Sequence, residues 1–245
     1  MLKIDRLSVS VFDSYIIKNL TLHVPPQSLH VLMGPNGSGK STLSYALAGH
    51  PRYTMQAQEL LFLDQDFVSL SPDKRAQRGF FLAVQNPPEI PGVNVFQFLK
   101  EAHAACTGKN SEVKKFQEEV ESYLKLLRLD PSFLQRSLYE NFSGGEKKRL
   151  ELLQLLVLKP KFALLDEIDS GLDIDALAIV SCAVALFRHE NPQSSLLVIT
   201  HNPQVARLLK PDRVHILYQG SLACSGGADL IDDLELKGYD ELIRR

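Results

Sequence analysis

The residues best suited to chemistry form a glycine-rich loop at positions 34–41. Its residues fit the pattern G-x-x-x-x-G-K-[ST], and Thr42 follows them: Gly34, Pro35, Asn36, Gly37, Ser38, Gly39, Lys40 and Ser41. Small residues let consecutive backbone N–H groups turn towards phosphates, and a following helix adds about half a positive charge at its amino terminus. Lys40 would reach the β- and γ-phosphates, and the Ser41 hydroxyl would ligate Mg²⁺. The loop predicts nucleotide binding, but alone it also fits kinases, GTPases and motors.

Two adjacent carboxylates, Asp166 and Glu167, follow the apolar run at 162–165. Ligands gather at the carboxyl ends of strands in open α/β sheets. Asp166 would then hold Mg²⁺ through water, and Glu167 would act as the general base for a water that attacks the γ-phosphate. Read alone, the pair fits a solvated strand end better. The glycine-rich loop reverses that preference.

A third group, Ser143, Gly144 and Gly145, precedes a strongly apolar stretch that reads as a helix. Its hydroxyl and amides would form a second anion site at a helix amino terminus, although by itself the group is only a capping motif. Gln85 lies between the two anion sites in the sequence, and His201 follows the apolar run at 196–199. The ordered set is far more specific than any of its parts.

Strands are the elements expected to position these residues. Residues 1–33 alternate apolar and polar positions, which predicts antiparallel strands. Leu29–Met33 is nearly continuous apolar sequence that leads into the loop, and a helix is expected at 41–49. The runs at 162–165 and 196–199 are typical of parallel strands buried on both faces, with a helix at 175–188 between them. A hairpin is expected at 214–224.

A helical region is expected between these core segments. Helices are predicted at 96–106, 112–128 and 146–158, with turns at 107–111 and 130–132. We therefore expect one domain over 1–245, with an α/β core at 1–92 and 159–245 and a helical subdomain at 93–158. The subdomain would carry Ser143, Gly144 and Gly145.

Composition narrows the class of protein. Apolar residues make up 44% of the 245 residues and charged residues 23%, which favours a globular fold over disorder. The net charge of −2 lacks the basic excess that a nucleic-acid-binding domain needs. No signal-peptide pattern and no run of about 18 apolar residues is present, so a cytoplasmic protein without membrane insertion is expected. The three cysteines lack metal-ligand spacing, and Cys106 and Cys182 are expected to pack among apolar neighbours.

In this order, the motifs resemble those of the ATP-binding-cassette ATPases over almost the full length. The resemblance implies a P-loop NTPase fold with a mixed central sheet, an amino-terminal antiparallel part and an inserted helical subdomain. It implies ATP and Mg²⁺ as ligands, with Gln85 as a further magnesium contact and His201 on the γ-phosphate. It also implies that Ser143, Gly144 and Gly145 reach a nucleotide held by a second copy in a head-to-tail pair.

A narrower resemblance is to the SufC family, the ATPases of the Suf iron–sulfur cluster assembly system. It is carried by 143–149, 165–177, 89–93 and 210–220. It implies SufB- and SufD-like scaffold proteins as partners. Two positions depart from the SufC-like pattern: Asn202 stands where an aromatic residue is usual, and 26–28 reads Pro-Gln-Ser. The aromatic residue that stacks on adenine is also unassigned, with Phe12 and Tyr15 as candidates and ordinary surface packing as the alternative.

Three alternatives stay open at this point. Residues 89–93 read equally as a rigid loop or as a partner-docking segment, and the resemblance favours docking. One of Lys147, Lys148 and Arg149 could pair with Glu167 in the resting chain, although a solvated helix face is the plainer interpretation. A nucleotide-binding subunit of a membrane transporter would share the whole ATP chemistry.

Overall fold

The computed structural model describes residues 1–12, 14–108 and 112–243. The expected turn at 107–111 therefore lies partly outside the described residues. Within them, no helix is long and apolar enough to cross a membrane.

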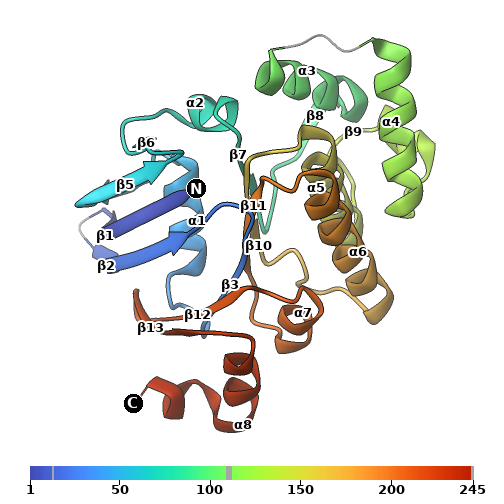
Figure 1. Cartoon of the computed structure of the whole chain (residues 1–245). Helices are drawn as coiled ribbons and strands as arrows, with labels where there is room; N and C mark the ends of the chain where they lie inside the picture. The colour runs from blue at the N-terminus through green and yellow to red at the C-terminus, as the bar shows by residue number, and fades with distance from the viewer. Residues whose placement is uncertain (13, 109–111, 244–245) are drawn as a thin grey trace.

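Two sheets form the core (Figure 1). The antiparallel sheet contains, in spatial order, β2 (Ser14–Val24), β1 (Leu2–Val11), β5 (Glu59–Phe62) and β6 (Gln65–Asp66), and β4 (Tyr53–Gln56) also pairs with β1. The six-stranded sheet has the order β13 (Ser221–Gly226), β12 (Arg213–Tyr218), β3 (Leu29–Met33), β11 (Ser195–Ile199), β10 (Phe162–Asp166) and β7 (Phe80–Ala83). Its pairings are parallel except for the β12–β13 hairpin. This confirms the expected mixed α/β architecture.

The parallel strands are mostly apolar, with exceptions such as His30 and His215, as expected for a sheet covered on both faces. In β10, Leu164 joins the core between the two sheets, whereas Ala163 and Leu165 join the core under the helices on the other face. Helix α1 (Lys40–Ala48) buries Leu43 and Leu47 in the first of these cores. Burial between two sheets fixes the helix that begins at the glycine-rich loop.

Most of the remaining helices cover the opposite face and one end of the six-stranded sheet, whereas the first of them is bound through Arg75 to the Ala46 and Leu47 oxygens of α1 (Figure 1). They are α2 (Pro72–Gln77), α3 (Val95–Thr107), α4 (Val113–Leu126), a 3₁₀ turn (Pro131–Gln135), α5 (Gly144–Leu158), α6 (Ile174–Glu190), α7 (Pro203–Leu208) and α8 (Asp229–Ile243). Two further short strands pair antiparallel: β8 (Ile90–Asn94), which precedes α3, and β9 (Ser137–Leu138), which precedes α5. The expected helices at 96–106, 112–128 and 146–158 are present with bounds shifted by one or two residues.

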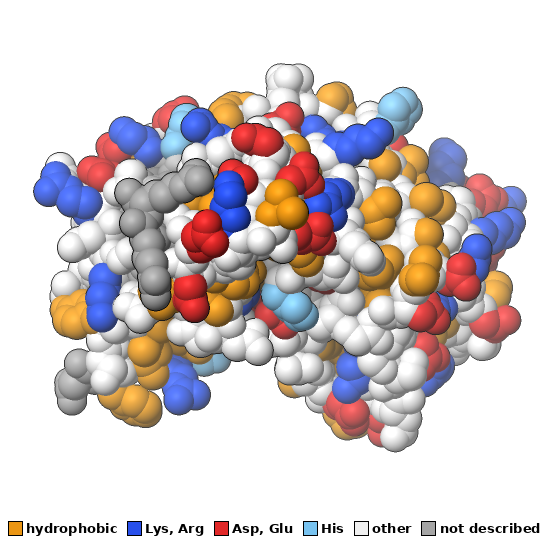
Figure 2. Space-filling model, turned by 90° about the horizontal axis from the view of Figure 1, so that it is seen from below, with side chains coloured by type: hydrophobic (Ala, Val, Ile, Leu, Met, Phe, Trp, Pro, Cys, Tyr) orange, Lys and Arg blue, Asp and Glu red, His pale blue; other side chains and the backbone are white. Residues whose placement is uncertain are grey.

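Surface charges are mixed, in keeping with the near-neutral sequence. Figure 2 shows acidic and basic side chains interspersed over the face seen from below. The three cysteines are free; Cys182 is exposed, and Cys106 and Cys224 are partly buried. The expectation that Cys182 packs among apolar neighbours is therefore wrong, because this position of α6 faces away from the buried stripe of Val180, Ala183 and Val184.

Candidate functional site

The glycine-rich loop joins β3 to α1, as its sequence predicts. Gly39 caps the helix with φ 107°, a left-handed conformation that favours glycine. Gly34 lies against the strand end at Leu217, where an added Cβ would come within 2.2 Å of the Leu217 carbonyl oxygen. Both glycines are thus required by backbone geometry, and the loop is held close to the sheet.

Lys40 is buried inside this loop. Its Nζ donates to the carbonyl oxygens of Gly34 at 2.9 Å and Pro35 at 3.0 Å. Burial lowers the pKa of Lys40, and the nearby Glu167 and Asp166 carboxylates work against that shift. The ammonium group therefore occupies the space within the loop and has carbonyl partners that a phosphate could replace.

The two carboxylates lie where the buried strand β10 ends. Asp166 is 1% exposed, and its Oδ1 has no hydrogen-bond partner. Burial raises the pKa of Asp166 to about 6, and hydroxyl contacts from Ser44 and Ser41 partly offset the rise. Glu167 follows with φ 49°, a strained conformation for a non-glycine residue that is common at functional sites.

Glu167 has two polar neighbours, Gln85 just after β7 and His201 just after β11. Gln85 Nε2 donates to Glu167 Oε2 at 2.5 Å, and His201 Nδ1 lies 3.7 Å from Glu167 Oε1. These three side chains line a cavity of about 500 Å³ together with part of the loop: Asn36, Gly37, Gly39, Lys40, Ser41 and Thr42. Residues far apart in the sequence therefore meet in one hollow, because the parallel strands end at the same edge of the sheet.

The basic residues of α5 do not pair with Glu167, contrary to the resting-state hypothesis. Lys148 Nζ donates instead to the backbone oxygen of Gln85 at 2.9 Å, and Lys147 lies 3.5 Å from Glu89. Lys148 is 5% exposed, so it is not part of a solvated face either. Its contact reaches Glu167 only through Gln85.

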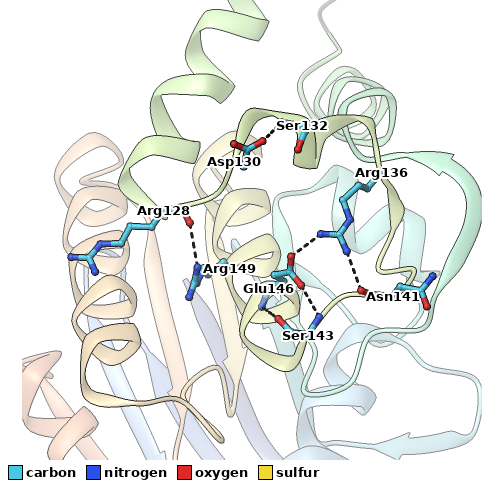
Figure 3. A network of polar contacts seen from close by, with 8 residues as sticks. All are labelled: Arg128, Asp130, Ser132, Arg136, Asn141, Ser143, Glu146 and Arg149. Atoms are coloured by element: carbon cyan, nitrogen blue, oxygen red, sulfur yellow. Dashed lines mark hydrogen bonds and ion pairs between the residues drawn. The ribbon is translucent and has the colours of Figure 1, made fainter.

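Ser143, Gly144 and Gly145 do not line this cavity. Ser143 caps α5 by accepting from the Glu146 N–H at 3.2 Å, while the Glu146 carboxylate accepts from the Ser143 N–H at 2.8 Å. This reciprocal capping box satisfies two backbone donors at once. Figure 3 shows the arrangement, with Arg136 bound to the same carboxylate. The two predicted anion sites are therefore separate within one chain.

Neither candidate aromatic residue lines the cavity. Phe12 is 83% exposed beside the Arg52 guanidinium, and the Tyr15 hydroxyl donates to Gln56 at 3.3 Å. Ile16 forms that wall of the cavity. Ile16 could not be identified from the sequence, because a strand isoleucine carries no signal that separates it from core residues.

A second residue that sequence reasoning did not assign is Asp169. It is 5% exposed and accepts from the Thr200 hydroxyl at 2.7 Å, while its Oδ1 is unpartnered. The bond ties the segment after Glu167 to the residue before His201. One indication of this role was present in the sequence, because Asp169 is a third acidic residue close to Asp166 and Glu167.

The donor set fits a magnesium ion. Mg²⁺ prefers hard oxygen ligands and keeps several waters. Ser41 and Gln85 line the cavity and supply oxygen donors to it, and the Ser41 hydroxyl contacts the buried Asp166 carboxylate, which lies behind the lining and has one unpartnered oxygen. A carboxylate that is buried without a full set of partners is costly, and a cation beside it would remove that cost.

A glycine-rich loop at a helix amino terminus, carboxylates at the end of the adjacent strand and a separate helical anion site together define a nucleotide-binding cassette. Comparisons with known proteins agree. The chain matches the family described as ABC transporter over residues 17–170. It is 44% identical to the "Probable ATP-dependent transporter SufC" of Escherichia coli (strain K12), covering 98% of this chain and 97% of that protein. It is also 44% identical to "Vegetative protein 296" of Bacillus subtilis (strain 168), covering 98% and 92%.

Solved structures show the same fold. A dimeric ATP-binding cassette in a post-hydrolysis state with ADP and Pi superposes with a TM-score of 0.79 at 20% identity, covering 93% of this chain and 99% of that one. This chain therefore belongs to the ATP-binding-cassette family, and within it to the SufC-like ATPases. It is an ATPase that converts ATP and water to ADP and phosphate.

Proposed function

We propose that this ATPase drives conformational change in a SufB–SufD-like scaffold during iron–sulfur cluster assembly. The observation that carries the proposal is the exposed segment at 89–93, directly after the Gln85 region. Ile90 is 39% exposed, and β8 pairs with β9, the strand that leads into the Ser143 loop. A partner bound at β8 would therefore touch an element connected to both anion sites.

For the chemistry, we assign roles to the residues around the cavity. The amides of the glycine-rich loop and Thr42 bind the phosphates, and Lys40 exchanges the Gly34 and Pro35 oxygens for phosphate oxygens. Ser41, Gln85 and, through water, Asp166 would hold Mg²⁺, and the ion would neutralise developing charge on the phosphates. Glu167 accepts the proton of the attacking water, and His201 contacts the γ-phosphate.

Gln85 competes with water for Glu167 in the resting chain. The Gln85 amide donates to Glu167 Oε2, which leaves that oxygen a weaker acceptor for a water proton. To contact Mg²⁺, the Gln85 side chain would have to turn away from Glu167. The same movement would release Glu167, which would couple nucleotide entry to activation.

We further propose that the active form is a head-to-tail pair of two copies. Ser143, Gly144 and Gly145 do not line the cavity of their own chain, so a second copy supplies them to the γ-phosphate. Ile174, 84% exposed after the Ser170–Asp173 segment, suits contact with that copy. In this arrangement 93–158 acts as a helical subdomain that moves against the core of 1–92 and 159–245.

A pull-down from the native cell tests the proposed partners. Recovery of two SufB- and SufD-like proteins with the wild-type chain is expected. An Ile90→Glu variant should lose them and keep its ATPase activity, because a buried glutamate at the contact is costly. Val68→Glu is a matched control, since Val68 is 38% exposed on a different part of the surface. Absence of these partners from the wild-type sample would overturn the assembly role.

The names of the relatives favour one other candidate. Several carry the description "Probable ATP-dependent transporter". A nucleotide-binding subunit of a membrane transporter would use the same cavity and dock on transmembrane helices. Recovery of a membrane permease in the same pull-down would support this alternative and exclude the scaffold.

A further inference from the structure

A negatively charged side chain lies beside the Ser143 anion site. Glu146 lies in the first turn of α5, three residues after Ser143, and its carboxylate binds the Ser143 N–H. Although burial acts to raise the pKa of Glu146, hydrogen bonds from Ser143 and Arg136 hold it below its usual value. The carboxylate is therefore charged at neutral pH. A phosphate that approaches Ser143 meets a negative charge beside it.

Arg136 is the residue that neutralises this charge. Its guanidinium donates to Glu146 Oε1 at 2.7 Å and to the Asn141 backbone oxygen at 3.0 Å (Figure 3). One side chain thus fixes both ends of the loop that precedes Ser143. The loop is anchored again where β9 pairs with β8.

Two aromatic rings hold the guanidinium in place. Arg136 lies 4.2 Å from the Phe142 ring centroid and 5.3 Å from that of Phe133. The planar group is suited to simultaneous stacking and forked hydrogen bonding, which lysine cannot reproduce. Arg136 is therefore preorganised before any nucleotide arrives.

We propose that Arg136 is a positioning residue for ATP hydrolysis: by neutralising Glu146 and fixing the 136–142 loop, it makes the Ser143 site able to accept the γ-phosphate bound to a second copy of this chain. Arg136 itself touches no nucleotide in this scheme. The inference rests on the proposed head-to-tail pairing. A purely structural ion pair would instead affect folding alone.

Substitutions that separate charge from structure test this role. Arg136→Gln leaves Glu146 uncompensated, and we expect kcat at saturating Mg-ATP to fall about tenfold, since juxtaposed like charges are costly. The affinity of the single chain for ATP, measured below the concentration at which chains pair, should stay within about twofold of wild type. Adding Glu146→Gln to Arg136→Gln should restore kcat to within about threefold of wild type, because the repulsive charge is then gone.

Arg128→Gln is the matched control. It removes a positive charge from the same region, but the Arg128 side chain points away from Glu146 in Figure 3. Its kcat should equal that of wild type. Thermal unfolding of each variant shows whether the fold is intact. If Arg136→Gln does not fold, Arg136→Lys replaces it; lysine keeps the charge on Glu146 but loses the stacking and the forked hydrogen bonds, so kcat should fall by only about threefold.

Three results would overturn the inference: an unchanged kcat for Arg136→Gln, a double variant no more active than Arg136→Gln, or a tenfold loss for a folded Arg136→Lys. Failure of the pairing proposal gives a different result. Wild-type activity per chain would then be independent of chain concentration, whatever the variants do.

Discussion

The two anion sites of this chain are built in opposite ways. Around the glycine-rich loop, the polar groups that would meet nucleotide are bound to one another: Lys40 to two loop carbonyls and Gln85 to Glu167. Around Ser143, the capping box and Arg136 hold a loop that needs no change of partners to present its hydroxyl and amides. We therefore expect the first site to rearrange when nucleotide binds and the second to be preformed.

This difference indicates that the site at the glycine-rich loop controls hydrolysis. A site that must exchange hydrogen bonds lowers its own affinity by the cost of the exchange, whereas a preformed site avoids it. In the proposed mechanism the same site holds the base Glu167, so hydrolysis would require nucleotide and the movement of Gln85. The Ser143 site would then act as a fixed surface on which the second nucleotide-bound copy closes.

The largest expected effect is at the rearranging site. Lys40→Ala should weaken ATP binding by more than about a hundredfold, because the ammonium that reaches the phosphates is removed. Calorimetric titration with Mg-ATP measures this. Lys74→Ala is the control, since Lys74 is exposed and its side chain bonds Gln77. Binding by Lys40→Ala within a few-fold of the control would show that the loop does not hold the phosphates.

The next effect separates binding from chemistry. Glu167→Gln should bind Mg-ATP as tightly as wild type while kcat falls by about 10² to 10⁴, because the amide cannot accept the proton from water. Single-turnover hydrolysis measures the chemical step. Asp175→Asn, an exposed carboxylate in the first turn of α6, serves as the control. Normal turnover by Glu167→Gln would remove it as the base.

A third prediction concerns Glu151 in α5, the helix that carries the preformed site. Glu151 is 3% exposed and accepts from the Tyr139 hydroxyl, and burial raises its pKa to about 7. Its folded pKa therefore lies above the unfolded value, so the folded chain binds more protons between pH 4.5 and 7. Stability falls as pH rises through this window, by up to about 3 kcal/mol at pH 8.

Glu151→Gln should remove that loss. The variant should gain stability relative to wild type as pH rises from 5 to 8, measured by urea denaturation at each pH. Glu118→Gln on the exposed part of α4 is the control and should give no pH-dependent difference. A constant difference for Glu151→Gln across this range would mean that Glu151 does not gain a proton on folding.

The smallest effect tests the capping box. Ser143→Ala should cost about 1 kcal/mol of stability through the lost cap, and it should also lower kcat. Asn94→Ala removes the comparable cap of α3, where Asn94 accepts from the Gln97 N–H at 3.2 Å. It should cost the same stability without loss of kcat. If Ser143→Ala and Asn94→Ala had the same kcat, Ser143 would act only as a structural cap.

The sequence predicted the elements that carry the motifs well. β3 matches at both ends, and α1 and β10 match within one residue. These elements are set by local patterns: a glycine-rich loop, continuous apolar runs and turn residues. The buried face of α6 was harder to assign, so Cys182 was misplaced. A helix of apolar residues does not show by pattern alone which side meets the sheet.

Side-chain partners were the part that sequence could not supply. Lys148 has Glu167, Glu151 and the Gln85 carbonyl within its surroundings, and only the fold shows that the carbonyl is its partner. Arg136 carries no motif, and its role follows from the loop that brings it back to Glu146. A long flexible side chain can reach several neighbours. Which of them it contacts depends on the folded arrangement and cannot be read from the order of the residues.

The central claim is that one complete site needs two chains. Light scattering of the Glu167→Gln variant at micromolar concentration, with Mg-ATP and then with ADP, tests it most directly, because bound ATP persists when turnover stops. The account predicts the mass of two chains with Mg-ATP and of one chain with ADP, and one chain in both conditions once Lys40→Ala is added. A single-chain mass with saturating Mg-ATP bound would contradict it.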